Sequence, residues 1–292
     1  MSTPFLKMTG AGNDFLVFDD RECGLGDISP QRWASLCARR TGVGADGILL
    51  LRESDSCDFR MVFFNADGGE GQMCGNGARC LAWAAAVESG LGRELTMDSP
   101  RPDGWGIPQG IGGRQVWSVT FEAADGRHDA LGWERTVLVS LGSASDPVEL
   151  TLETSEGAVS GSLLSVGVPH FISLTGDPQS VPLDSIGLWL RSHQRLGPGG
   201  ANVSFLAREP DDEGSYSIRT FERGVEAETL SCGTGAAAAA AILAREGVSA
   251  PVSIRAGGGV LNVYLTAGEQ GVGDIWLEGP VRVIYRGVLA DI

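Results

Sequence analysis

Lysine and histidine are scarce in this chain of 292 residues. The chain has 22 lysines and arginines together, and Lys7 is the only lysine among them. A pyridoxal-phosphate enzyme binds its cofactor as a Schiff base on a lysine, and only Lys7, near the N-terminus, could serve. The 3 histidines, His128, His170 and His193, are too widely spaced for a multi-histidine metal site. We therefore expect neither a cofactor nor a metal ion.

Basic clusters and long hydrophobic runs are also missing. The net charge is −15 and Arg39-Arg40 is the only adjacent basic pair, whereas a nucleic-acid partner requires a clustered basic face. The longest apolar run, Ala236–Ala244, covers about half of a membrane span. The N-terminus lacks the basic and then apolar order of a signal peptide. We expect a cytoplasmic protein without nucleic-acid or membrane partners.

The 6 cysteines do not require disulfides, because a chain of this length can bury a substantial core without them. Free thiols are usually small core residues. We predict this role for four of them: Cys23, Cys37, Cys57 and Cys80.

Short β-rich runs separated by turn residues outnumber the helical stretches, and the 43 glycines are consistent with many turns. Strands are expected at Phe15–Phe18, Gly47–Leu51, Phe59–Phe64, Val116–Phe121, Thr136–Leu141, Val148–Leu152, Tyr216–Phe221, Val260–Leu265 and Val281–Tyr285.

Helices are expected at Gln31–Arg40, Ala78–Ser89 and Ala236–Glu246, each with a start or stop signal at one end. Leu183–Gly200 reads as a short helical patch followed by a loop. Ser99–Gly113 is too rich in proline and glycine for the interior of an element, so we expect a surface excursion there. The pattern as a whole predicts an α+β protein.

One motif occurs twice, and it divides the chain into two related halves. Cys74 opens the sequence C-G-N-G-A and Cys232 opens C-G-T-G-A, 158 residues later. Each motif runs into an alanine-rich helix, and each follows a polar loop that carries acidic residues. Each half therefore presents one cysteine at the start of a helix.

A helix start leaves backbone N–H groups without partners and has a partial positive charge, which favours a thiolate and binds carboxylates. One such site would suggest a nucleophilic cysteine enzyme, with His170 as the plausible partner. Two facing sites suggest a racemase or epimerase that uses two bases and no cofactor. One thiolate would remove the α-proton while the opposite thiol donates a proton, and both helix ends would stabilise the carboxylate. A disulfide between the halves and a zinc site are the alternatives.

Further motifs occur along most of the chain, and their order is informative as well as their sequences. They are Lys7–Phe15, Gly44–Gly47, Asn65–Gly68, Met73–Cys80, Gly200–Val203, Glu222–Gly224 and Thr229–Gly235. Together they resemble the diaminopimelate epimerase family. The resemblance implies two pseudo-symmetric lobes, each a mixed sheet wrapped around a central helix, with the active site in the cleft between them. The expected lobes are residues 1–135 with 280–292, and residues 136–279.

The resemblance also assigns roles to residues. It makes Cys74 and Cys232 the acid–base pair that interconverts LL- and meso-2,6-diaminopimelate. Four residues on the helix ends would hold the reacting α-carboxylate: Gly75, Asn76, Gly233 and Thr234. Five others would hold the distal end of the substrate: Asn13, Asn65, Asn202, Glu222 and Arg223. A guanidinium suits a carboxylate, a carboxylate suits an ammonium, and amides both donate and accept.

One position departs from the family pattern. Gly167-Val168-Pro169-His170 has valine where the family usually has an asparagine that helps to bind the distal end. The loss of a hydrogen-bonding group leaves open a related racemase for another amino acid, such as histidine or proline. A binding protein that has lost catalysis is a second alternative, and both cysteines argue against it. The sequence leaves monomer and homodimer open.

Overall fold

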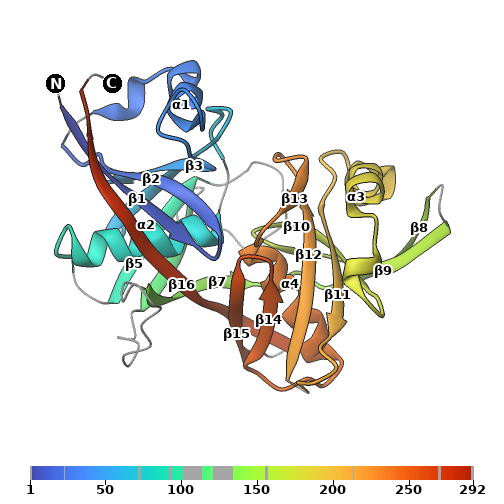
Figure 1. Cartoon of the computed structure of the whole chain (residues 1–292). Coiled ribbons are helices and arrows are strands. Elements are labelled where there is room, and N and C mark those ends of the chain that lie inside the picture. The colour runs from blue at the N-terminus through green and yellow to red at the C-terminus, as the bar shows by residue number, and fades with distance from the viewer. Residues whose placement is uncertain are drawn as a thin grey trace. The chain divides into compact units, whose positions relative to one another are not determined.

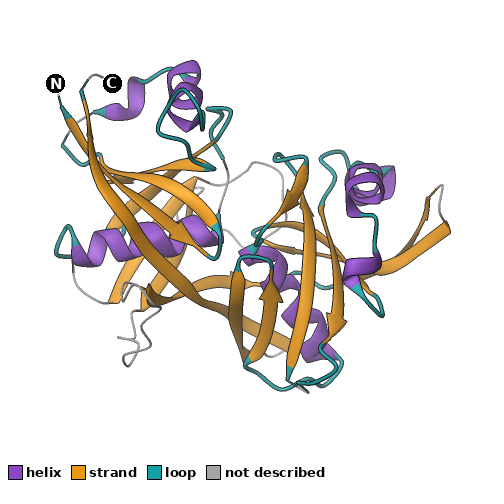
Figure 2. Cartoon of the chain, viewed as in Figure 1, coloured by secondary structure: helices purple, strands orange, loops and turns teal. Residues whose placement is uncertain are grey.

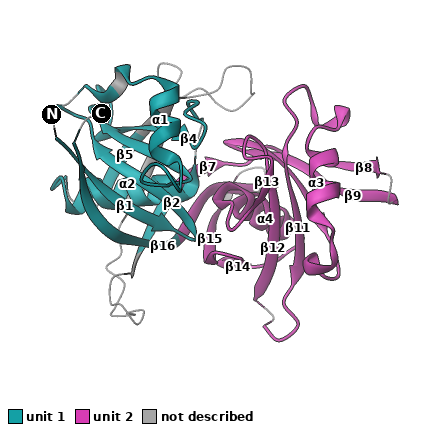
Figure 3. Cartoon of the chain, turned by 45° about the horizontal axis from the view of Figure 1, so that its top comes forward, with its two compact units in different colours: residues 1–139, 279–292 teal, residues 140–278 magenta. Residues whose placement is uncertain are grey.

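The computed structural model describes residues 2–22, 24–71, 74–91, 94–100, 114–120, 134–154, 157–212, 214–268 and 271–290. The chain forms two compact units, residues 1–139 with 279–292 and residues 140–278 (Figure 3). The sequence placed these boundaries at 135/136 and 279/280. Strands β7 and β16 each run across a boundary. No helix in the described part of the chain is long and apolar enough to cross a membrane.

Unit 1 is built on a mixed sheet (Figure 1). The strand order is β1-β2-β3-β4-β5-β6-β7, and β16 pairs with the free side of β1. The β2/β3 and β4/β5 pairs are parallel and the other pairs are antiparallel. The strands are β1 Thr3–Gly10, β2 Asn13–Asp19, β3 Gly47–Arg52, β4 Phe59–Asn65, β5 Glu94–Pro100, β6 Arg114–Thr120, β7 Glu134–Ser143 and β16 Gly271–Leu289.

Helix α2 (Gly75–Val87) is the central helix of unit 1 and contacts strands β1 to β5 (Figure 2). Its residues are mostly small, and a helix that is apolar around most of its surface belongs in a core. The small residues allow a close approach of the sheet. A Cβ on Gly10 of β1 would lie 2.9 Å from the backbone oxygen of Asn76 and 3.1 Å from Sγ of Cys80. The helix is therefore enclosed by its own sheet.

Helix α1 (Pro30–Cys37) covers the other face of this sheet. Alternate side chains of a strand point to opposite faces. Ile48 and Leu50 of β3 join a buried cluster with Trp33 of α1, whereas Leu49 lies against Gly77 of α2. Because β3 is covered on both faces, its sequence is a continuous apolar run. A 3-10 turn at Leu25–Asp27 precedes α1.

Unit 2 repeats this arrangement. Its strand order is β16-β15-β14-β12-β11-β10-β9-β8, with β13 beside β12. The β10/β11 and β12/β14 pairs are parallel, and the other pairs are antiparallel. The further strands are β8 Val148–Thr154, β9 Gly157–Val166, β10 Val168–Leu174, β11 Asn202–Arg208, β12 Ser215–Glu222, β13 Ala227–Thr229, β14 Val252–Ala256 and β15 Gly259–Gly268.

Helix α4 (Gly233–Arg245) is the central helix of unit 2 and contacts β9, β10, β11, β14 and β15. Helix α3 (Leu183–Arg191) packs on the sheet through Leu183 and Leu190, which join a buried cluster with Phe171 of β10. Two 3-10 turns, Pro178–Ser180 and Gln194–Leu196, flank α3.

The repeat in the sequence is therefore a repeat of topology. In unit 1 the parallel pair β2/β3 is joined through α1, and β4/β5 through α2. In unit 2 the parallel pair β10/β11 is joined through α3, and β12/β14 through α4. The predicted α+β class is confirmed.

The described part of each predicted strand lies in an observed one, and Phe121 falls outside the description. The two central helices begin three residues earlier than predicted, because Cys74 and Cys232 are themselves the N-cap residues. The first helix ends at Cys37 rather than Arg40. Of the predicted excursion, residues 99 and 100 end β5, and 101–113 lie outside the described residues.

The cysteine predictions have different outcomes. Cys37 and Cys80 are buried, as predicted. The prediction for Cys57 is wrong, because it lies half-buried in the loop before β4. Cys23 falls outside the described residues.

Candidate active site

Cys74 is the N-cap of α2. Its backbone is extended, and its Sγ accepts a hydrogen bond of 3.4 Å from the backbone N–H of Gly77. The side chain is half-buried, whereas the next two residues, Gly75 and Asn76, are buried. The sulfur therefore lies against the first turn, where N–H groups lack partners within the helix and the positive end of the dipole lies.

Cys232 is the N-cap of α4 and is buried. Its Sγ lies 3.6 Å from Oγ1 of Thr234, within the first turn of the helix. A Cβ on Gly235 would lie 3.3 Å from Cβ and Sγ of Cys232 and 3.4 Å from Oγ of Ser204. The second glycine of the motif therefore leaves room for the sulfur. Gly233 and Thr234 are buried beside it.

Two predicted binding residues of unit 1 meet in a chain of hydrogen bonds. Asn13 donates through Nδ2 to Oδ2 of Asp46 at 3.3 Å. Asn76 donates through Nδ2 to Oδ1 of Asn13 at 2.6 Å, and Arg79 donates to Oδ1 of Asn76 at 2.8 Å. This chain of hydrogen bonds links the Gly44–Gly47 motif, which contains Asp46, to the first turn of α2.

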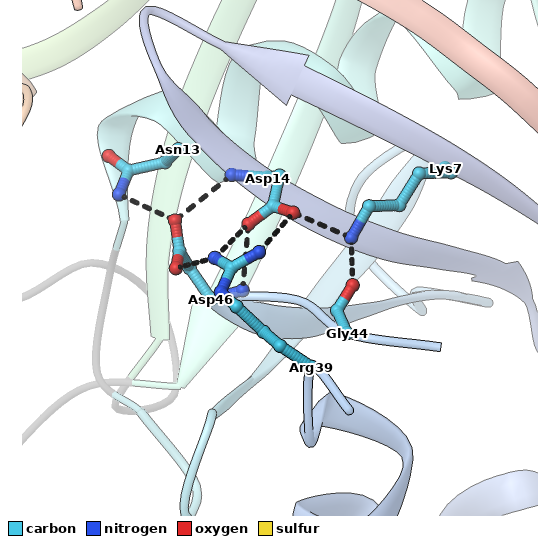
Figure 4. Close-up of polar contacts among 6 residues, drawn as sticks. All are labelled: Lys7, Asn13, Asp14, Arg39, Gly44 and Asp46. Carbon is cyan, nitrogen blue, oxygen red and sulfur yellow. Dashed lines mark hydrogen bonds and ion pairs between the residues drawn. The ribbon is translucent and has the colours of Figure 1, made fainter. Parts of the chain in front are cut away.

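Asp46 is itself part of a charged cluster (Figure 4). Arg39 donates to both Asp14 and Asp46, with a distance of 2.6 Å to Asp46. Lys7 pairs with Asp14 at 2.7 Å and also donates to the carbonyl oxygen of Gly44. Burial opposes ionisation of Asp14, yet hydrogen bonds from Arg39 and Lys7 lower its pKa to about 2. The cluster therefore holds the start of β2, where Asn13 lies, in a fixed position.

Asn65 ends β4 and shapes a tight turn with its backbone. Its N–H donates to the carbonyl oxygen of Gly69 at 2.9 Å, and its own carbonyl accepts from Gly68 at 2.9 Å. The structure thus gives Asn65 a turn role, which is common for asparagine. The binding role implied by the family resemblance concerns its side chain and stays a prediction.

In unit 2, Asn202 and Arg223 also meet. The buried Asn202 accepts a hydrogen bond of 2.8 Å from the backbone N–H of Arg223 and donates to the carbonyl oxygen of Pro169 at 3.4 Å. Next to Arg223 in the chain, Glu222 accepts through Oε2 from Thr229 at 2.9 Å. Three predicted binding residues therefore lie at adjoining ends of β11 and β12.

The guanidinium of Arg223 lies in a half-buried position. It contacts the carbonyl oxygens of Gly199 and Gly200 at 3.4 Å each. Burial and the nearby charge of Arg191 lower its pKa. Because burial and a like charge both disfavour this cation, a bound carboxylate would stabilise it.

His170 does not pair with a cysteine. It is fully buried in β10, opposite Asn202 of β11, and neither ring nitrogen has a hydrogen-bond partner among the described residues. Burial and the charge of Arg223 lower its pKa to about 3. A nucleophilic cysteine would need a hydrogen-bonded base, so the structure does not support the alternative that used His170.

Asp46 and Arg79 have no role in the predicted site, although both lie within the motifs. The signal for Arg79 was present: it is a lone cation in an alanine-rich helix, at the position where the second repeat has Ala237. Asp46 carried no such signal, because its contact with Asn13 joins residues that are 33 apart in the sequence. Among the described residues, no group of three or more metal-ligating His, Cys, Asp or Glu side chains occurs.

Known proteins resemble this chain in both sequence and fold. The family model described as diaminopimelate epimerase matches residues 5–101 and 162–283. The diaminopimelate epimerase of Chlorobaculum tepidum is 36% identical, over 97% of this chain and 99% of the relative. That of Aquifex aeolicus is 35% identical over 98% of both chains.

Solved structures share the fold at low identity. A phenazine biosynthesis protein of Bacillus anthracis superposes with a TM-score of 0.69 and 15% identity over 100% of both chains. A probable proline racemase from Agrobacterium radiobacter gives a TM-score of 0.68 and 17% identity, covering 99% of this chain and 93% of that one.

Two units of one topology, each with a central helix capped by a cysteine, together with the relatives named as epimerases identify an isomerase of the epimerase class. More particularly, the chain belongs to the diaminopimelate epimerase family.

Proposed function

We propose that this protein interconverts LL- and meso-2,6-diaminopimelate without a cofactor, with Cys74 and Cys232 as the two acid–base groups. The observation that carries the proposal is that both central helices, each of 13 residues, begin at a cysteine N-cap. Family membership supports the substrate class.

The α-carboxylate of the substrate binds to the two helix starts in this proposal. Gly75 and Asn76 on α2 and Gly233 and Thr234 on α4 offer buried first-turn N–H groups, which favour an anion. As the α-proton leaves, negative charge moves onto this carboxylate. Fixed donors then stabilise the developing charge more strongly than water would.

The proton transfer itself needs one sulfur on each face of the α-carbon. One thiolate takes the α-proton and the opposite thiol donates its own, so the configuration inverts and the two sulfurs exchange protonation states. The reverse reaction uses the same groups in the opposite roles. No redox change occurs, and the protons balance.

The distal amino-acid end is held by Asn13, Asn65, Asn202, Glu222 and Arg223. Arg223 suits the distal carboxylate because it is a partly desolvated cation. Glu222, which accepts a hydrogen bond from Thr229, suits the distal ammonium. A cytoplasmic location belongs to the same proposal because both thiols must stay reduced, and an amino acid is its only required partner. Sedimentation analysis decides between the monomer and the homodimer that the sequence leaves open.

A related amino-acid racemase is the second candidate, and Val168 is the observation that favours it. Valine occupies the start of β10 and cannot form the hydrogen bond that an asparagine could make to a polar distal group. α-Proton exchange in deuterium oxide, measured on a panel that includes diaminopimelate, histidine and proline, separates the two candidates. Exchange with another amino acid and none with diaminopimelate would replace the first proposal by the second.

The mechanism is tested by Cys74→Ala and Cys232→Ala. Each variant should lose epimerisation by at least about a hundredfold, because inversion requires a proton donor and acceptor on opposite faces. Cys57→Ser is the matched control, since it removes a half-buried thiol from a loop of unit 1. Full activity in either alanine variant would contradict the two-thiol mechanism.

A further inference from the structure

Arg79 is a buried cation in the second turn of α2. Its side chain is 0% exposed. One terminal nitrogen donates to Oδ1 of Asn76 at 2.8 Å and the other to the carbonyl oxygen of Gly75 at 3.3 Å. Its Nε has no partner among the described residues. A buried charge is costly unless an opposite charge accompanies it, so this arrangement requires an explanation.

The hydrogen-bond chain through the two asparagines fixes where this cation lies. Arg79 can only donate and the Asp46 carboxylate can only accept. These two ends therefore set the direction of both amides between them: the oxygen of Asn76 faces Arg79, and the oxygen of Asn13 faces Asn76. The guanidinium is held against the first turn of α2, directly after Cys74.

Among the described residues, the thiols of Cys80 and Cys74 have a favourable electrostatic interaction with this guanidinium. Burial lowers the pKa of Arg79 to about 10, while the charges of Cys80 and Cys74 act in the opposite direction. Burial also raises the pKa of Cys80 to about 12, so that thiol stays neutral near pH 7. Cys74, which is half-buried and caps the helix, is the group left to become the anion.

Other charges near α2 do not take this role. The charged groups of the strands packed on α2 for which side chains are described are Lys7, Asp14, Asp19, Arg52 and Arg60. Lys7 and Asp14 pair with each other, Asp19 pairs with Arg21, and Arg52 pairs with Asp20. Neither these acids nor Arg60 is among the groups that shift the pKa of Arg79. The side chains of Glu94 and Asp98 on β5 lie outside the description.

The second repeat differs at this position. Arg79 lies five residues after Cys74, and the residue five after Cys232 is Ala237, which is buried in α4. The two helices therefore share the cysteine cap and the glycines, but only α2 places a cation at this point of the repeat.

We propose that Arg79 is the buried counter-ion of the Cys74 thiolate, and that Asn76, Asn13 and Asp46 hold it in place. Arg79 is a positioning residue because it acts on the thiolate and does not touch the substrate. The inference rests on the proposed function only in giving Cys74 a catalytic role.

The test measures the thiol pKa of both cysteines in the same sample. Wild type, Arg79→Met, Arg79→Gln and Arg79→Lys are alkylated with iodoacetamide from pH 5 to pH 10, and labelling is quantified by peptide mass spectrometry. Arg79→Gln is also neutral but keeps a hydrogen-bond donor for Asn76, so it replaces Arg79→Met if the methionine variant does not fold. Arg79→Lys keeps the charge, and Cys232 is the internal control.

In the neutral variants we expect the pKa of Cys74 to rise by about one unit or more, so that its alkylation near pH 7 slows about tenfold. Arg79→Lys should retain most of the wild-type reactivity, and Cys232 should stay unchanged. An unchanged Cys74 pKa in a folded neutral variant would overturn the inference. Alkylation does not depend on turnover, so a Cys74 shift in a protein that epimerises nothing would contradict the proposed function alone.

Discussion

Asn76 donates a hydrogen bond of 2.6 Å to Asn13, which joins the first turn of α2 to the start of β2. Each amide has a charged group on its far side, Arg79 beyond Asn76 and Asp46 beyond Asn13. Two residues that the motifs mark as substrate binders thus also orient one another. Their orientation depends on the two charged groups that lie behind them.

Asp46→Asn should reduce epimerase activity by about tenfold. The new amide can donate as well as accept, so the orientation of Asn13 is no longer enforced. The free energy of unfolding should fall by about 1.5 to 3 kcal/mol, as for a hydrogen bond to a charged group. Steady-state kinetics and urea unfolding measure the two effects. The comparison variant is Arg286→Ala, which removes the exposed partner of Glu88 and leaves the charged cluster intact. It should cost about 1 kcal/mol or less and retain activity. Equal losses of activity in both variants would contradict the role given to Asp46.

Gly235→Ala should separate activity from stability. The added Cβ would lie 3.3 Å from Sγ of Cys232, so the sulfur must move by a few tenths of an ångström. Alanine is favoured over glycine in a helix by about 0.5 to 1 kcal/mol, which offsets the crowding. We expect kcat to fall several-fold with little change in the melting temperature. Gly176→Ala, where nothing lies within 4 Å of the added Cβ, should leave both unchanged. An unaltered kcat in Gly235→Ala would remove the steric argument.

His170 should make the protein sensitive to acid. Its pKa is about 3 in the folded state, lowered by burial and by Arg223, and about 6.5 when unfolded. Below pH 6.5 the unfolded chain binds the extra proton first, so stability is lost as the pH falls from 6.5 towards 3. At pH 5 this loss is about 2 kcal/mol.

Urea unfolding of wild type and His170→Leu at pH 7.5 and pH 5 checks the sign of this effect. The wild type should lose more stability than the variant. An equal loss in both would show that His170 is not the group responsible.

Val168→Asn should improve the use of diaminopimelate if that is the substrate. An added amide that bonds the distal end contributes about 1 kcal/mol, which corresponds to a KM about fivefold lower at a similar kcat. Val168→Thr, with a shorter polar group on a β-branched side chain, is the control for polarity alone. A higher KM for diaminopimelate in Val168→Asn would favour the other amino-acid racemase.

The sequence by itself determined the local features of this protein. The alanine-rich runs that end near glycine specify the two central helices, because helix propensity and stop signals are properties of neighbouring residues. The duplicated C-G-x-G-A motif places a cysteine at the start of each. Alternating or β-rich runs specify strands such as β4 and β12, since a half-buried strand has a period of two.

Strands β10 and β11 were not predicted from the sequence. Strand β11, with the sequence NVSFLAR, is buried at every position except its last, and the alternation of its first four residues ends in the apolar pair Leu206-Ala207. Strand β10 carries proline and a buried histidine, which are unusual in strands. Their identity as strands comes from pairing with each other and with β9 and β12, and such pairing is a long-range property.

Only the tertiary structure decided how the charged residues are used. Asp46 and Asn13 are 33 residues apart, and Asn13 and Asn76 are 63 apart, yet they form one hydrogen-bond chain with Arg79. The sequence identifies each of these residues within a motif, but their contacts arise because β2, β3 and α2 pack in one unit. The cysteine at a helix start is therefore determined by local sequence. The cation behind it is bonded locally too, to Gly75 and Asn76 of its own helix. Its burial and the orientation of Asn76 are consequences of packing, because the surrounding sheet excludes water and the link to Asn13 and Asp46 joins distant parts of the chain.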